Sequence, residues 1–348
     1  MPELRRDPVI GRWVIISTER AKRPDQFSAG GIEKEELAPG EKCPFCEGNE
    51  SMTPPEIYAL RKPGTNANAS GWEVRVIPSI SPLLSIGGGL DRRGHGMYDL
   101  MNARGAHEIV IDTPEHLTAA QLSQDEMIKS MNVVLDRLRD LERDPWIKYV
   151  LVFKNHGKAA GGGHIKHSRL QLIGTPVNLK RVKEELAGAK SYYDYKERCV
   201  FCDIIAEEPK TAKRVITESK YYIAIAPFAS RFPFETWIMP KKHSCDFYKV
   251  NRGEIPDFVG MVKLVLAKMR KVIGEFPFNL VSHTAPFRRD AAKKGYWETI
   301  EYDYHWHFEI LPILTRVAGF EWGSGFYINP VPPDMAAENL LSVEIEAK

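Results

Sequence analysis

Two segments far apart in the chain carry the same pattern of apolar and polar positions. They read HEIVIDTPEH (107–116) and FETWIMPKKH (234–243), and in each a Glu lies eight residues before a His, with alternating apolar residues and a Pro between them. Such alternation is typical of a half-buried strand. The pattern therefore predicts one strand that ends shortly before His116 and another that ends shortly before His243.

The segments that follow these two histidines match in their order as well. After each His comes an amphipathic stretch with helical spacing, then an apolar strand, and then a His-containing segment that runs into a further apolar strand. These stretches are 122–143, 148–157 and 167–174 after the first His, and 254–273, 278–286 and 305–314 after the second. Because one order of elements appears twice, the sequence predicts an internal repeat.

The length of the chain agrees with two units. A chain of 348 residues is long for one hydrophobic core but suits two units of ~150 residues each. A charged segment with helical character, 178–198, separates the repeats. We therefore expect a boundary near residue 190, with an N-terminal αβ unit over 1–190 and a C-terminal αβ unit over 191–348.

Composition narrows the range of partners and locations. Lys and Arg total 48 against 46 Asp and Glu, a net charge of +2, and no long basic run occurs, so no nucleic-acid partner is expected. No stretch approaches the ~20 apolar residues of a membrane span, and no long apolar region follows the N-terminal charges. We expect a cytoplasmic protein without a membrane partner.

Four of the five cysteines fall in two CxxC pairs, and the repeat gives each pair two histidines. Tetrahedral zinc accepts thiolate and imidazole ligands, and a CxxC turn presents two thiolates to one point. A redox pair would explain a single CxxC, but two copies in register with two histidines each favour two zinc ions. Four protein ligands would close each coordination shell, which suits a structural role. The predicted ligands are Cys43, Cys46, His116 and His167 for the first ion, and Cys199, Cys202, His243 and His305 for the second.

An ordered set of short motifs runs nearly from end to end of the chain, among them CPFCEGNE, FKNHGKAAGG, CVFCDII, HWHFEILP and GFEWGSGFYINPVPP. With these motifs the chain resembles the galactose-1-phosphate uridylyltransferase family, a branch of the histidine triad superfamily. The resemblance implies an α+β fold of two tandem histidine-triad-like units with antiparallel sheets and packed helices, zinc at both ligand sets, and a homodimer. Some relatives bind a metal near the second half's histidines instead, which leaves zinc and iron open for the second metal. The matching residues are Glu185, His283, His305 and His307.

The resemblance also implies a reaction and its substrates. Members of the family transfer a nucleoside monophosphate between a nucleotide sugar and a sugar 1-phosphate through a nucleotidyl-histidine, and a plant relative phosphorolyses ADP-glucose. Arg20, Arg23, Asn155 and Gln171 match residues around the phosphates, and Glu321 matches a hexose-contacting glutamate. Guanidinium groups suit phosphate oxygens, which agrees with the two arginines. The implied partners are a nucleotide sugar and a sugar 1-phosphate or phosphate.

The segment that should carry the nucleophile departs from the family pattern. The family has HxHxQ, whose second His attacks phosphorus, whereas this chain reads HSRLQ over 167–171. Aligned on Gln171, Arg169 takes the nucleophile position. A guanidinium is protonated at every reasonable pH and cannot act as a nucleophile.

A second alignment brings other candidates. Aligned from Asn155, Ser168 comes near the nucleophile position, and His164 becomes a displaced candidate. The second half keeps an intact HxHxE that contains His307, for which a structural or metal-binding role competes with catalysis. Where the family contacts the nucleoside, the aliphatic Ile80 cannot accept a hydrogen bond from a ribose hydroxyl.

Three functions remain on the sequence alone. The first is a nucleotidyltransferase in which Arg169 stabilises phosphate charge and transfer proceeds without a histidine intermediate. The alternative is a catalytically altered nucleotide- or phosphosugar-binding protein, and the third is two-step transfer through a rearranged nucleophile. The retained metal ligands and phosphate-binding residues favour an enzyme. Its catalytic candidates are Arg169, Gln171 and His164, and its substrate-binding candidates are Arg20, Arg23, Asn155, Ser168 and Glu321.

Overall fold

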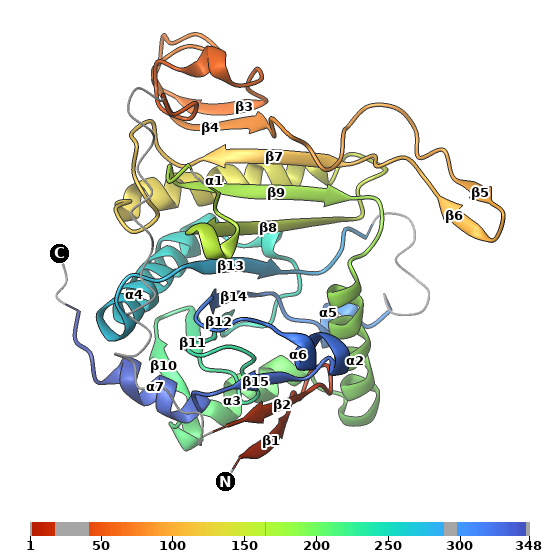
Figure 1. Ribbon diagram of the computed structural model, residues 1–348, viewed down its shortest axis with the longest axis vertical. Coiled ribbons are helices and arrows are strands. Elements are labelled where there is room, and N and C mark those ends of the chain that lie inside the picture. The colour runs from red at the N-terminus through yellow and green to blue at the C-terminus, as the bar shows by residue number, and fades with distance from the viewer. Residues whose placement is uncertain (1, 18–41, 164, 289–297, 346–348) are drawn as a thin grey trace.

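The computed structural model describes residues 2–17, 42–163, 165–288 and 298–345. Within these residues a ten-stranded sheet runs through the molecule, and every pair of neighbouring strands in it is antiparallel (Figure 1). In order across the sheet, the strands are β10 (Val215–Glu218), β11 (Tyr222–Ile225), β12 (Thr236–Pro240), β14 (His307–Pro312), β13 (Phe278–His283), β8 (Tyr149–His156), β9 (Arg169–Thr175), β7 (Ala106–Ile111), β4 (Trp72–Pro78) and β3 (Tyr58–Arg61).

The order of strands repeats between the two halves of this sheet. Counted inward from each edge, β3-β4-β7-β9-β8 of the first half corresponds to β10-β11-β12-β14-β13 of the second. The innermost strands β8 and β13 pair with each other, with Asn155 opposite Asn279 and Phe153 opposite Val281. The expected α+β fold with antiparallel strands is therefore confirmed, and the sheets of the two repeats are joined into one.

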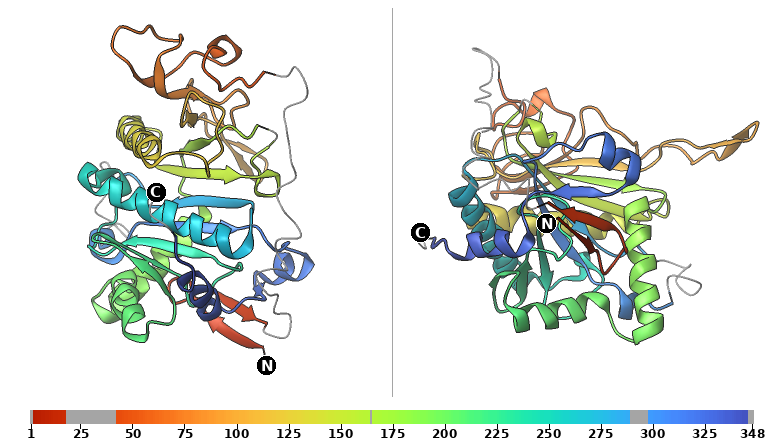
Figure 2. Two further views of the ribbon diagram at one scale, coloured as in Figure 1. Left: turned by 90° about the vertical axis from the view of Figure 1, so that its left-hand side faces the viewer. Right: turned by 60° about the horizontal axis from the view of Figure 1, so that its bottom comes forward.

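Two long helices cover one face of the sheet (Figure 2). They are α1 (Gln124–Leu141) and α4 (Ile255–Ile273), which correspond to the predicted helices 122–143 and 254–273. Their apolar side chains share one buried core with residues of both halves of the sheet. The start of α1 is fixed by a capping box, because the Ser123 hydroxyl accepts from the Glu126 N–H while the Glu126 carboxylate accepts from the Ser123 N–H.

The opposite face is covered differently in the two halves. In the second half, α2 (Lys180–Lys196), α3 (Val200–Thr211) and α5 (Ile300–Asp303) pack there around a second core. In the first half, the segment with the first CxxC pair covers this face and packs Phe45 against β4 and β7. The first half therefore has a thinner cover on the face that bears Arg169 and Gln171.

The remaining elements lie at the periphery. The strands β5 (Arg93–His95) and β6 (Tyr98–Leu100) form a hairpin that extends from the body (Figure 1). A small sheet joins the N-terminal strands to the C-terminal part of the chain. The other elements are β1 (Glu3–Arg6), β2 (Trp13–Ile16) and β15 (Tyr327–Asn329) of that sheet, α6 (Gly319–Ser324), α7 (Pro333–Leu341), and the 3-10 turns η4 (Glu50–Met52), η5 (Lys158–Ala160), η6 (Phe247–Lys249) and η7 (Arg252–Glu254).

The division into units 1–190 and 191–348 stays a prediction. Residue 190 lies inside α2, and β2 near the N-terminus pairs in parallel with β15 near the C-terminus. None of the helices in the described part of the chain is long and apolar enough to cross a membrane.

Candidate functional site

The four predicted metal ligands of the first half lie together beside β9. Nδ1 of His167 is 3.6 Å from Sγ of both Cys43 and Cys46, and Nδ1 of His116 is 3.5 Å from Sγ of Cys46. A tetrahedral ion with bonds of ~2.3 Å to sulfur and ~2.0 Å to nitrogen would place these atoms ~3.5 Å apart. Nε2 of His167 donates to the Thr113 carbonyl at 2.8 Å, which leaves Nδ1 free to bind a metal. These residues could hold a metal ion.

The second group has the same arrangement. Sγ of Cys202 lies 3.3 Å from Nδ1 of His243 and 3.6 Å from Nδ1 of His305. Backbone carbonyls lie 3.0 and 2.8 Å from the Nε2 atoms of these two histidines and accept their hydrogens. With Cys199, all four ligand atoms lie within 4.8 Å of one another. The second group could therefore hold a metal ion as well.

The thiols in each pair need a cation to ionise together. Burial and the adjacent Cys43 raise the pKa of Cys46 to about 12. In the second pair, the hydrogen bond to Cys202 and burial raise the pKa of Cys199. Two thiolates side by side repel each other, and a divalent cation between them would remove that repulsion. The donor set of each group thus fits a soft divalent metal.

A third cluster lies where α2 packs on the second half's strands. It contains Glu185, His283, His307 and Glu309, whose ligand atoms also lie within 4.8 Å of one another. Although burial opposes it, Glu185 and Glu309 raise the pKa of His283 to about 10, because the ring lies 2.8 and 3.3 Å from their carboxylates. Arg231 lies 2.5 Å from Glu309. The cluster could hold a metal, but its charges also balance internally.

The strand register places Arg169 where the second half has His307. Gln171 of β9 pairs with Phe153 of β8, Glu309 of β14 pairs with Val281 of β13, and Phe153 and Val281 pair with each other where the two halves meet. Arg169 and His307 each lie two residues earlier on their strands. Side chains two residues apart on a strand project from the same face. The alignment on Gln171 therefore agrees with the register, and Arg169 occupies the place of the second histidine.

The Arg169 guanidinium donates hydrogen bonds to backbone carbonyls around it. It donates to the carbonyls of Gly162 at 2.7 Å, Ile165 at 2.7 Å and His167 at 3.1 Å, and its Cζ lies 5.4 Å from the centroid of the Phe45 ring. Burial lowers the pKa of Arg169, but a guanidinium remains protonated at neutral pH. Arg169 therefore holds the preceding loop beside the first cysteine–histidine group.

Gln171 and Asn155 lie next to Arg169 on the same face. Oε1 of Gln171 lies 3.1 Å from Nε2 of His107, and Nδ1 of His107 accepts from the N–H of Leu83 at 3.2 Å. Nε2 of His107 therefore donates to Gln171. This bond leaves the Gln171 amide NH₂, which can donate to a phosphate oxygen. The Asn155 carbonyl accepts from Asn279 at 2.7 Å, which fixes its orientation.

Ser168 projects from the opposite face, toward α1. Its hydroxyl donates to the Asp112 carboxylate at 2.7 Å and accepts from Lys154 Nζ at 2.7 Å. Lys154 and Asp112 also form an ion pair, and all three residues are buried. Because adjacent strand residues face opposite ways, Ser168 does not take the place of Arg169.

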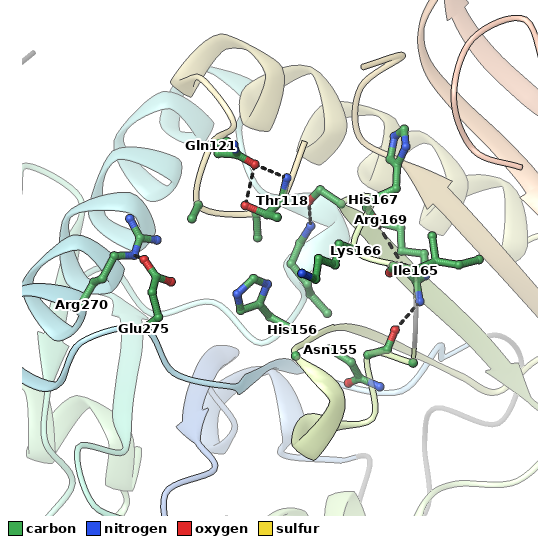
Figure 3. Close-up of a pocket in the computed structure, with 17 residues that line it drawn as sticks. Thr118, Gln121, Asn155, His156, Ile165, Lys166, His167, Arg169, Arg270 and Glu275 are labelled. Atoms are coloured by element: carbon green, nitrogen blue, oxygen red, sulfur yellow. Dashed lines mark hydrogen bonds and ion pairs between the residues drawn. The ribbon is translucent and has the colours of Figure 1, made fainter. Parts of the chain in front are cut away.

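A cavity of about 540 Å³ lies at the end of the strands, next to Ser168 (Figure 3). We call it the helix-side cavity because the loop before α1 and the end of α4 form part of its wall. Its volume falls in the range of small-molecule binding sites. Its lining comes from residues 118–121, 154–157, 162–163 and 165–169, with Arg270 and Glu275.

The other predicted site residues fall outside this arrangement. Arg20, Arg23 and His164 lie outside the described residues, so their expected roles stay predictions. Glu321 lies in α6, where its carboxylate accepts from the Ala318 N–H at 3.1 Å, and it does not line the helix-side cavity.

Sequence reasoning missed several residues of this region. The motif FKNHG contains Lys154 and His156, yet only Asn155 received a role. Arg270 carried no signal, because it reads as one charge on the polar face of an amphipathic helix. His107, the partner of Gln171, lies within β7, and the sequence pattern assigned it only to the strand.

Known proteins similar to this chain span nearly its whole length. A family described as "Domain of unknown function (DUF4921)" matches residues 95–347. ADP-glucose phosphorylase of Arabidopsis thaliana is 35% identical over 351 residues, which cover 99% of this chain and 93% of the relative. Galactose-1-phosphate uridylyltransferase of Thermotoga maritima is 28% identical over 361 residues, covering 99% of this chain and 100% of the relative.

Solved structures agree with these relatives. The crystal structure of the Arabidopsis thaliana ADP-glucose phosphorylase with bound ADP-glucose matches this chain with a TM-score of 0.80 and 32% identity, covering 99% of this chain and 100% of that chain. The relatives are enzymes, and their similarity spans both halves of the fold. The chain is therefore a nucleotidyltransferase enzyme that belongs to the galactose-1-phosphate uridylyltransferase family.

Proposed function

We propose that this enzyme transfers a nucleoside monophosphate between a nucleotide sugar and phosphate or a sugar 1-phosphate in a single displacement. The observation that carries the proposal is the register of β9, in which Arg169 stands at the place of the second histidine. An arginine cannot form the nucleotidyl-enzyme that a two-step transfer requires. The neighbouring Gln171 amide remains available to contact a phosphate, as does the second amide hydrogen of Asn155, whose first donates to the Gly161 carbonyl at 3.3 Å.

In this reaction the acceptor attacks the donor directly. An oxygen lone pair of the acceptor phosphate forms a bond to the α-phosphorus, while the bond from that phosphorus to the departing sugar 1-phosphate breaks. Both the attacking and the leaving groups are phosphate oxygens, so the chain's task is to orient them and to balance charge. The Gln171 amide would donate to a nonbridging oxygen of the α-phosphate, while Arg169 holds the loop that borders it.

ADP-glucose with inorganic phosphate is the first substrate pair to test, because the name of the Arabidopsis relative and its bound ligand both point to it. UDP-sugars with hexose 1-phosphates form the second panel. Products are followed together with the mass of the denatured protein. A donor with a chiral α-phosphorothioate then separates the mechanisms, because one displacement inverts the configuration at phosphorus and two displacements retain it.

The expected result is turnover with inversion and without a nucleotidyl-protein. Retention together with an adduct would overturn the single displacement, and the adduct's position would identify a rearranged nucleophile such as His164. Binding without turnover across both panels would instead favour the alternative, a catalytically altered nucleotide- or phosphosugar-binding protein. The observation that favours this alternative is that Arg169 donates to three backbone carbonyls.

We also propose that both cysteine–histidine groups hold zinc. Their sulfur–nitrogen separations of 3.3 to 3.6 Å suit a tetrahedral ion. With four protein ligands each, the ions would stabilise the fold and leave the transfer to the surrounding residues. Homodimerisation and a cytoplasmic location remain predictions from the sequence.

A further inference from the structure

A single displacement requires that donor and acceptor be bound at the same time. A two-step enzyme can use one phosphate subsite twice, but direct transfer needs a second subsite beside the first. Resting on the proposed function, we propose that the helix-side cavity is this second subsite. It binds the phosphate group of the acceptor, inorganic phosphate or a sugar phosphate, between Lys166 and Arg270, with His156 as a hydrogen-bonding partner.

The position of the cavity suits this role. Asn155 and Arg169 line it, and the same two residues border the face of the sheet that carries Gln171. The loop before α1 and the end of α4 form part of the cavity wall and Gln171 does not line it, so the cavity adjoins the face where the donor phosphate is expected without coinciding with it. An acceptor bound in the cavity could therefore approach the donor around the end of β8 and β9.

The charge of the lining favours an anion. Four cationic side chains and one carboxylate line the cavity. Two of the cations already have partners, because Lys154 forms an ion pair with Asp112 and Arg169 donates hydrogen bonds to backbone carbonyls. Lys166 forms no ion pair with any described residue, and Arg270 has one, to Glu275 at 2.9 Å. Lys166 and Arg270 are thus the cations available to a ligand.

The imidazole of His156 lines the cavity and has no hydrogen-bond partner among the described residues. In Figure 3 its ring and the Lys166 side chain both point into the middle of the space. Its ring packs against Phe278, with centroids 4.9 Å apart, and no described residue forms a hydrogen bond with it. Burial, Lys154 and Arg270 lower its pKa to about 4. The neutral ring can donate one hydrogen bond to a phosphate oxygen and accept one from a hydroxyl.

A glycine-rich turn forms part of the cavity wall. The loop 157–163 turns tightly at the end of β8, and Gly157, Gly161 and Gly163 adopt positive φ values of 82°, 80° and 67°. A side chain at Gly162 would meet the Gly157 carbonyl oxygen at 2.9 Å. The absence of a side chain at Gly162 therefore lets the loop fold back on itself. The Arg169 guanidinium donates to the Gly162 carbonyl and holds the loop in place.

The test is binding of inorganic phosphate to the full chain, measured by calorimetry in the absence of nucleotide and repeated with glucose 1-phosphate. Lys166→Ala and Arg270→Ala are each expected to weaken binding about tenfold, because each removes a charged hydrogen-bond donor. Glu275→Gln is expected to strengthen binding about threefold, because it releases Arg270. The matched control is Lys263→Ala, an exposed position on α4 that does not line the cavity.

Two further measurements separate this inference from the proposed function. The affinity for ADP should stay unchanged in Lys166→Ala and Arg270→Ala, since the donor binds elsewhere. His156→Phe should weaken phosphate binding while His156→Asn, which keeps a hydrogen-bond donor, preserves most of it. Phosphate affinity that is equal in all variants, no phosphate binding at millimolar concentration, or an equal loss of ADP affinity would each overturn the second subsite. Absence of turnover would overturn the proposed reaction but leave these binding results to decide the subsite independently.

Discussion

The two halves of the molecule build the same strands but differ at one face. At equivalent places the second half has His283, His307 and Glu309, while the first half has Asn155, Arg169 and Gln171. In the second half these groups are buried under a cover of helices, where His283 contacts Glu309 at 3.3 Å and stacks on the His307 ring. In the first half, Asn155 and Arg169 border an open cavity. The comparison teaches that both copies of the duplicated scaffold keep their cysteine–histidine group. The residue at the position of Arg169 and His307 differs between the copies, and its chemistry differs with it.

Removal of metal ligands should have the largest effect and should differ between the halves. Cys43→Ser and Cys199→Ser are each expected to lose one metal equivalent per chain. Cys199→Ser should destabilise the fold more, by about 4 kcal/mol or more, because its group is enclosed by α3 whereas His116 of the first group is exposed. Metal content and denaturant unfolding measure the two effects. Two metal equivalents retained in both variants would contradict the assignment of ligands.

Loss of a buried arginine should come next. Arg231 contacts both Glu235 and Glu309, at 2.9 and 2.5 Å, whereas Arg137 of the first half contacts the single buried Glu108 at 2.7 Å. Arg231→Met would remove the guanidinium from two buried carboxylates, of which Glu309 keeps its contact with His283, and should cost about 4 kcal/mol of unfolding free energy. Arg137→Met should cost about 3 kcal/mol or less. Equal costs would show that the second half's network does not depend on Arg231 in the way its contacts indicate.

Substitution of Arg169 should have a moderate effect on stability. Arg169→Met removes three hydrogen bonds to carbonyls of the loop and should lower the unfolding free energy by about 2 kcal/mol. Arg169→His should destabilise the fold similarly but place an imidazole where the second half has His307. The mass of the denatured protein after exposure to donor nucleotide is the readout. An adduct on the histidine variant alone would show that the first half lacks only its nucleophile.

The smallest effect should appear in the dependence of stability on pH. The pKa of His156 is about 4 in the folded chain, below the ~6.5 of an unfolded histidine, mainly because it is buried. Below pH 6.5 the unfolded chain binds a proton that the folded chain does not, so stability should fall as the pH decreases from 6.5 toward 4. Both His156→Phe and His156→Asn should remove this part of the decline. An NMR titration of His156 with a midpoint near 6.5 would contradict this expectation. In the same experiment His283, with a pKa of about 10, should stay protonated.

The sequence predicted the parts of the molecule that depend on local spacing. Alternation and helical periodicity located the strands around Glu108 and Glu235 and both long helices within a few residues. The grouping of the cysteines and histidines was predictable because the repeat presents the same spacing twice. In each case the signal lies in one segment or in a comparison of two segments.

The sequence could not predict what depends on how distant segments meet. Alternation within β8 and β13 does not say that these two strands pair, so the continuous sheet was not foreseen. Arg270 reaches the first half's cavity from a helix of the second half, and only tertiary packing brings it near His156. The hydrogen bonds from Arg169 to backbone carbonyls likewise depend on the path of the loop that precedes β9.

The pairing of β8 with β13 has a consequence for how the protein can come apart. Were the chain cut between its halves, each fragment would expose an unpaired strand edge in the middle of a hydrophobic core. Such edges attract other strands and promote aggregation. The two repeats should therefore unfold in one cooperative transition. Loss of either repeat in evolution would expose the innermost strand of the other, which would then need a new partner to cover its edge.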